Sequence, residues 1–130
     1  MSQDDFSLYG LSLKSRLLVG TAEYTSPKIL EQALTSIQPG MITLSLRRET
    51  ASKSTLSDNG FWDFIKSLDI PILPNTAGCY SVKEAVTVAQ MSREVFETNF
   101  IKVEITGDDY NLQPDPFALV EACETLTKMG

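Results

Sequence analysis

The sequence predicts an α/β protein built around a parallel sheet, because strand-like and helix-like segments alternate four times along its 130 residues. Each strand and helix together occupy roughly thirty residues, as in a βα unit. No linker or low-complexity segment separates the units, so we expect a single domain over residues 1–130. Two architectures fit this order: an open doubly wound domain, or half of a (β/α)8 barrel, which normally needs about 250 residues.

A short hairpin is expected first, in residues 6–13, where apolar residues alternate with polar or small ones around a glycine. Residues 16–20 then form an apolar run that is typical of a buried strand. Ser26-Pro27 predicts the start of a helix, because serine accepts a hydrogen bond from the first turn and proline fits the first helical position. Apolar residues at helical spacing continue this helix until Pro39-Gly40 ends it.

The second unit begins with an apolar strand over residues 41–46. A loop rich in serine and threonine follows through 47–59, and a short helix is expected across 61–68. The third strand is predicted over 70–73. Pro74 is expected to end it, because proline cannot donate a backbone hydrogen bond within a central strand.

The last two helices have clear start signals. Ser81-Val-Lys-Glu84 is a capping box, and about fifteen helical residues are expected after it. Between the two helices, the β-branched run Phe100–Ile105 predicts the fourth strand. Asp115-Pro116 repeats the cap-then-proline signal before a final helix that ends at Gly130. We expect the apolar stripes of all four helices to form the core; in the last helix the stripe is Phe117, Leu119, Val120, Cys123, Leu126 and Met129.

The fourth strand carries an amine beside a carboxylate. Side chains alternate between the faces of a strand, so Lys102 and Glu104 share one face while Ile101, Val103 and Ile105 share the other. On an exposed edge strand this pair would be a surface salt bridge worth at most about 1 kcal/mol. On a barrel strand the same face would point inward, where a charged pair indicates a chemical role. These six residues alone leave both interpretations open.

Composition excludes several classes of function. The net charge is −6 and there is no long basic run, so we expect neither nucleic acid nor an anionic membrane as a partner. The N-terminus is acidic and no apolar run is long enough to cross a membrane, which predicts a cytoplasmic protein. There is no histidine, and Cys79 and Cys123 form no C-x-x-C pattern, so we expect no metal site, disulfide framework or cofactor.

Further polar residues follow the predicted strands. Asn75 and Thr76 could hydrogen-bond a substrate, yet asparagine and threonine after proline are also ordinary turn residues. Arg47-Arg48 could bind an anionic group, but such a pair is more often solvated or paired with a neighbour such as Glu49. We therefore consider Asn75, Thr76 and Arg47 as candidates for substrate binding.

In their order and spacing these segments resemble the N-terminal half of bacterial thiazole synthase, an enzyme of thiamin biosynthesis. The resemblance extends over essentially the whole chain. The matching segments are Val19-Gly20-Thr21, Thr43-Leu44 through Arg47-Arg48, Leu73-Pro74-Asn75-Thr76-Ala77-Gly78, Glu84-Ala85, Ile101-Lys102-Val103-Glu104 and Pro114-Asp115-Pro116.

The resemblance implies a (β/α)8 TIM barrel of which this chain covers about the first four units after the N-terminal hairpin. It also implies a reaction that makes the thiazole phosphate from 1-deoxy-D-xylulose 5-phosphate, dehydroglycine and sulfur delivered as a thiocarboxylate on a sulfur-carrier protein. By this resemblance Lys102 forms an imine with the sugar ketone and Glu104 is an acid/base group. The implied partners are the sulfur carrier, the enzyme that produces dehydroglycine and further copies in a homo-oligomer.

Two other functional classes stay open at this point. A class I aldolase also places an imine-forming lysine on a barrel strand. A non-catalytic open α/β domain would serve as a binding or regulatory module, and it predicts a stable monomer, whereas half a barrel exposes unpaired strand edges.

Overall fold

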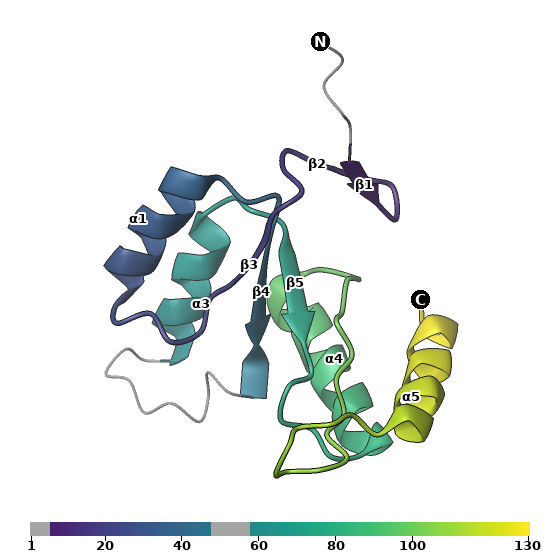
Figure 1. The fold of residues 1–130 in the computed structure, drawn as a ribbon. Coiled ribbons are helices and arrows are strands. Elements are labelled where there is room, and N and C mark those ends of the chain that lie inside the picture. Colours follow the sequence, from purple (N-terminus) through teal and green to yellow (C-terminus); the bar gives the residue numbers. More distant parts are fainter. Residues whose placement is uncertain (1–5, 48–57) are drawn as a thin grey trace. The chain divides into compact units, whose positions relative to one another are not determined.

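The computed structural model describes residues 6–47 and 58–130 (Figure 1). Arg48, Glu49 and most of the loop rich in serine and threonine lie outside the described residues. The chain divides into two compact units, of which the first contains residues 1–43 and 56–72 and the second contains 44–55 and 73–130.

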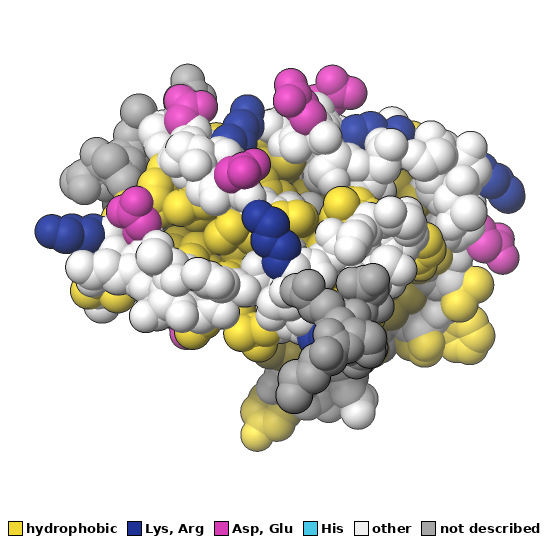
Figure 2. All heavy atoms as spheres, turned by 90° about the horizontal axis from the view of Figure 1, so that it is seen from above, with side chains coloured by type: hydrophobic (Ala, Val, Ile, Leu, Met, Phe, Trp, Pro, Cys, Tyr) yellow, Lys and Arg dark blue, Asp and Glu magenta, His cyan; other side chains and the backbone are white. Residues whose placement is uncertain are grey.

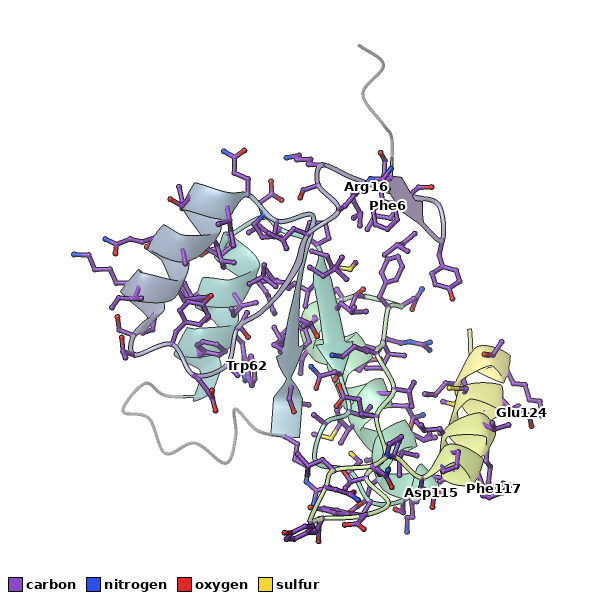
Figure 3. All side chains as sticks on the ribbon, in the orientation of Figure 1. Phe6, Arg16, Trp62, Asp115, Phe117 and Glu124 are labelled. Atoms are coloured by element: carbon purple, nitrogen blue, oxygen red, sulfur yellow. The ribbon has the colours of Figure 1, made fainter. Side chains whose placement is uncertain are left out.

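The first unit opens with the predicted hairpin. Strands β1 (Phe6–Leu8) and β2 (Leu11–Leu13) pair antiparallel. Tyr9 and Gly10 both have positive φ, at 46° and 84°, as a two-residue hairpin turn that matches the strand twist requires. The guanidinium of Arg16 lies over the Phe6 ring, 5.5 Å from its centroid (Figure 3).

The first βα unit has the predicted order of elements, but the expectation of a buried strand over residues 16–20 is wrong, because Leu18 is 39% exposed. Strand β3 (Leu18–Gly20) pairs in parallel with β4 (Met41–Ser45), and α1 (Pro27–Ile37) connects them. The helix begins where expected, because the Ser26 hydroxyl accepts a hydrogen bond from the Ile29 amide at 3.3 Å. Helix α3 (Asp58–Ser67) corresponds to the predicted second helix.

Gly40 lies at a close approach between two backbone segments in this unit. Its amide donates to the Leu17 carbonyl at 2.9 Å. A Cβ at this position would collide with the Ser15 carbonyl oxygen. Only glycine lets the chain leave α1 and enter β4 along this path, so Gly40 has a packing role beyond stopping the helix.

Strand β5 (Ile72–Asn75) completes a sheet of order β3-β4-β5, which is open within the part of the chain that the structure describes. The prediction that Pro74 ends the third strand is wrong, because Pro74 lies inside β5. The carbonyl of Pro74 accepts a hydrogen bond from the Lys102 amide at 2.8 Å. Its ring nitrogen faces the same side as this carbonyl, so the missing donor costs nothing toward β4.

The predicted fourth strand is also wrong as a regular element, since residues 100–105 are reduced to one parallel bridge at Lys102. The neighbouring strand explains why. Pro74 has no N–H to extend the ladder in one direction. In the other direction the Thr76 hydroxyl, and not its carbonyl, accepts the Glu104 amide at 2.7 Å. The Thr76 carbonyl instead accepts the Cys79 amide at 3.1 Å and starts a turn.

The second unit packs this segment against α4 (Val82–Phe96) and α5 (Pro116–Lys128). Both helices begin at their predicted caps: Ser81 accepts the Glu84 amide at 3.2 Å, and Asp115 accepts the Ala118 amide at 3.0 Å. The buried cluster of the unit consists of Cys79, Ala85, Ile105 and Ala122, with Val82, Val88, Val103, Ala118 and Leu119 packed against it.

The expectation that the apolar stripes of all four helices are core is wrong for α1, where Ile29 and Ile37 are 48% and 45% exposed, and also for the last helix. Helix α5 faces the cluster through Ala118, Leu119 and Ala122. Phe117 is 88% exposed, and Val120 is exposed as well. Figure 3 shows Phe117 pointing away from α4. Ala118 and Ala122 lie one turn apart on the covered side with Leu119, which leaves Phe117 and Val120 on the outer side.

Charge is dispersed over the surface that Figure 2 shows, where Lys and Arg side chains lie among Asp and Glu. Every helix within residues 6–47 and 58–130 is too short or too polar to cross a membrane.

Candidate functional site

The predicted site residues all belong to the second unit and follow the ends of its extended segments. Asn75 is the last residue of β5, Thr76 comes next, and Arg47 follows β4 after one residue. Lys102 and Glu104 lie on the segment that bridges to β5. In parallel α/β proteins, ligands bind at the carboxyl ends of the strands, so this location suits a site.

Lys102 and Glu104 form an ion pair, with 3.1 Å between Nζ and Oε1. Their side chains are 48% and 42% exposed. On the opposite face Val103 and Ile105 join the buried cluster. The predicted alternation of faces is therefore confirmed, although the segment is not a regular strand. The pair points away from the core that α4 and α5 cover.

Thr76 makes an unusual set of contacts with this segment. Its backbone amide donates to the Lys102 carbonyl at 3.2 Å. Its hydroxyl accepts the Glu104 amide at 2.7 Å and donates to the Glu104 carbonyl at 2.7 Å. Thr76 itself is fully buried. Sequence reasoning named Thr76 for substrate binding but missed this backbone role, for which the signal was a β-branched hydroxyl residue two positions after the proline of a strand.

Asn75 shapes the turn that follows β5. Its Oδ1 accepts the Ala77 amide at 3.1 Å, and the residue is buried. The Ser45 hydroxyl donates to the Ala77 carbonyl at 3.2 Å and ties the turn to the end of β4. These bonds match the turn chemistry considered from the sequence, while substrate binding by Asn75 stays a prediction.

Arg47 lies against the start of α4. Its Nη1 is 3.2 Å from Oε1 of Glu84 and 4.0 Å from the Cys79 sulfur. Hydrogen bonds to Cys79 and then Glu84 raise the pKa of Arg47 above its ordinary value. The Glu84 carboxylate also accepts the Tyr80 amide at 2.7 Å. The pKa of Glu84 is lowered mainly by this hydrogen bond from the Tyr80 amide, and next by the hydrogen bond from Arg47.

Glu84 is thus a member of the site that sequence reasoning treated only as a helix cap. The position of Glu84 in the sequence could have signalled this role. Glu84 lies in the first turn of the helix that follows β5, and Arg47 follows the neighbouring strand β4, so the two side chains can meet. The sequence left two roles for Arg47, binding an anionic group or pairing with a neighbour such as Glu49. In the structure Arg47 pairs with Glu84, and Glu49 lies outside the described residues.

The two cysteines differ in environment, and neither is in a disulfide. Cys79 is fully buried, and burial raises the pKa of its thiol. Cys123 is exposed. A protonated buried thiol is a poor nucleophile, which agrees with the interpretation of Cys79 as a small loop residue. Nearby, a hydrogen bond to Asp109 raises the pKa of Tyr80. The residues that the structure describes contain no cluster of three acidic, cysteine or histidine side chains suited to a metal.

Comparison with known proteins identifies the family. The profile of the family described as "Thiazole biosynthesis protein ThiG" matches residues 7–130. The chain belongs to this family. The resemblance seen in the sequence is therefore confirmed, and the segments at Leu73–Gly78 and Ile101–Glu104 fall inside the matched range.

Close relatives carry the name thiazole synthase. The protein from Paracidovorax citrulli is 54% identical over 99% of this chain and 48% of its own length. The protein from Neisseria meningitidis serogroup C is 56% identical over 95% of this chain and 47% of its own length. The chain thus spans about half the length of the curated relatives it matches.

A solved structure supports the fold. The crystal structure of the Amycolatopsis orientalis BexX/CysO complex contains a chain that matches 95% of this one with a TM-score of 0.73 and 21% identity. This chain corresponds to 50% of that chain. At such low identity the likeness shows the α/β fold alone.

Proposed function

We propose that this chain carries the imine-forming part of a thiazole synthase with a (β/α)8 barrel. The observation that carries the proposal is the Lys102–Glu104 pair, held 3.1 Å apart on the face opposite the buried cluster. Membership of the thiazole biosynthesis family supports it. Lys102 supplies the nucleophile and Glu104 the acid/base group.

The chemistry follows from these two groups. The neutral Lys102 amine attacks the ketone of 1-deoxy-D-xylulose 5-phosphate, and loss of water gives an imine. The protonated imine draws electrons from the adjacent carbon and makes its proton acidic. Glu104, two residues away on the same face, accepts that proton and returns it at a later step.

The ion pair does not oppose this reaction strongly. At the 3.1 Å that separates Nζ from Oε1, two unit charges attract by about 5 kcal/mol at an effective dielectric constant of about 20. Because both side chains are nearly half exposed, solvent reduces the net value to about 0–1 kcal/mol. Separating the pair to admit a substrate therefore costs little.

The remaining reactants are part of the same proposal. Dehydroglycine and a sulfur-carrier thiocarboxylate complete the thiazole, and a further enzyme produces the dehydroglycine. The family supports the sulfur carrier as a partner, as does the BexX neighbour, which was crystallised in a complex with CysO. We further propose a cytoplasmic homo-oligomer, with Asn75 and Arg47 contributing to substrate binding.

Borohydride trapping tests the imine. The chain is incubated with 1-deoxy-D-xylulose 5-phosphate, reduced and mapped by peptide mass. A reduced adduct at Lys102 is expected, and it should vanish in Lys102→Ala. The matched control is Lys83→Ala on α4, which should keep the adduct.

The absence of an adduct at Lys102 leads to one further step. The experiment is repeated after adding, as a second polypeptide, the half of the Paracidovorax citrulli protein that this chain does not match. Continued absence would refute the imine proposal. An adduct that forms but yields retro-aldol cleavage, with no thiazole when a carrier thiocarboxylate is supplied, would favour the class I aldolase alternative.

A further inference from the structure

We infer that Thr76 is a positioning residue whose hydroxyl fixes the backbone of Glu104 and so holds Lys102 and Glu104 together for the chemistry. This inference rests on the proposed function for its consequence, but its geometry stands on the hydrogen bonds alone.

Hydrogen bonds between the β5 region and the Lys102 segment fix the position of the Glu104 backbone. A regular parallel ladder continues through main-chain bonds on both sides of a bridge residue. Here the Lys102 amide donates to Pro74 at 2.8 Å, and the Lys102 carbonyl accepts from Thr76 at 3.2 Å. The next bond of the ladder is replaced, because the Thr76 hydroxyl contacts both the amide and the carbonyl of Glu104 at 2.7 Å.

The ion pair needs this support because its own attraction is weak. Its two side chains are nearly half exposed, and exposed ion pairs do not fix geometry by themselves. The positions of their Cα atoms are therefore set by the backbone, and at Glu104 the backbone is held by a side chain from the neighbouring strand.

The same contacts argue against a direct role for Thr76 with substrate. The residue is fully buried, and its hydroxyl hydrogen is already donated to Glu104. A substrate could reach this oxygen only after the Glu104 bond had broken. Thr76 thus acts through Glu104, whose side chain is 42% exposed.

Two substitutions separate the hydroxyl from the shape of the side chain. Thr76→Val keeps the size and branching but removes the oxygen, whereas Thr76→Ser keeps the oxygen and removes a methyl group. Each is combined with Glu104→Gln in a double-mutant cycle. The readout is reductive methylation of Lys102 by formaldehyde and dimethylamine-borane, normalised to Lys83 by peptide mapping.

In the wild-type background Glu104→Gln should raise the Lys102 to Lys83 labelling ratio about twofold or more, because it releases Lys102 Nζ from its 3.1 Å contact with the carboxylate. The same change is expected in Thr76→Ser. In Thr76→Val the effect of Glu104→Gln should largely disappear. If Glu104→Gln changes Lys102 labelling in Thr76→Val as much as in the wild-type background, the inference is overturned. It is also overturned if Thr76→Val weakens borohydride trapping of the sugar while the labelling cycle is unchanged, because that combination indicates that Thr76 contacts the substrate directly.

A second measurement does not depend on the valine variant folding. The Glu104 amide should exchange slowly in the wild-type chain, because it donates to a buried oxygen, and exchange at the rate of an unstructured peptide would overturn the inference. Failure of the proposed function is seen separately, since it removes the sugar adduct in wild type while leaving formaldehyde labelling and amide exchange as expected.

Discussion

Truncating Ile105 and Phe117 to alanine compares two apolar residues that the sequence pattern ranks alike. Ile105 is 1% exposed and lies in the cluster between α4 and α5, whereas Phe117 is 88% exposed. Removing buried methyl groups costs the transfer free energy and leaves a cavity, which for isoleucine to alanine amounts to about 2–5 kcal/mol. Removing an exposed side chain changes the free energy of unfolding by about 0.5 kcal/mol or less.

The difference is large enough for a thermal melt. Unfolding entropy of about 2.1 cal/mol/K per residue gives about 0.27 kcal/mol/K for 130 residues. A loss of about 3 kcal/mol in Ile105→Ala therefore lowers the midpoint by about 11 °C. Phe117→Ala should stay within about 2 °C of wild type, although it removes more atoms.

Far-UV circular dichroism during heating measures both midpoints, and urea unfolding provides an independent value for each. Ile105→Val serves as an intermediate, with an expected loss of about 0.5–1.5 kcal/mol. Equal losses for Ile105→Ala and Phe117→Ala would refute the assignment of the core. A larger loss for Phe117→Ala would mean that α5 packs through its other face.

Three further outcomes follow from the structure. At pH 8, Ellman's reagent should modify Cys123 within the mixing time and Cys79 only after denaturation, because burial raises the pKa of the Cys79 thiol; two fast thiols would contradict this. In urea unfolding, Gly40→Ala should lower the free energy of unfolding by about 1–3 kcal/mol, because the new Cβ would collide with the backbone. Gly20→Ala should lower it much less, because a Cβ at that position meets open space. Similar losses for the two variants would be inconsistent with the close approach at Gly40. Folded-state hydrogen bonds lower the pKa of Glu84, so its contribution to stability is present above its unfolded pKa and is lost as pH falls through the folded value. Stability of Glu84→Gln should therefore fall less on acidification than that of wild type, and parallel pH curves would argue against this partner set.

Local signals predicted much of the fold. Helix starts at Ser26, Ser81 and Asp115 were predictable because one side chain and its neighbouring amides decide them. The hairpin turn likewise depended on Gly10 and its flanking alternation. The faces of Lys102 and Glu104 followed from extended backbone alone, which is why they held without a regular strand.

Features that depend on a neighbouring segment were not predictable. The place of Pro74 inside β5 depends on which side of the strand its missing donor faces, and that is a property of the sheet. The exposure of Phe117 depends on which side of α5 meets α4. A periodic stripe identifies a helix but does not state which part of the stripe is covered.

The two carboxylates of the site differ in their partners. Glu84 accepts the Tyr80 amide and pairs with Arg47, and these contacts lower its pKa. A carboxylate that is held ionised in this way is a weak base and a poor proton carrier. Glu104 is arranged differently, because Thr76 contacts its backbone and leaves its carboxylate to Lys102. Glu84 is therefore suited to orienting Arg47, whereas the Glu104 carboxylate lies 3.1 Å from the amine to which the proposal assigns the imine.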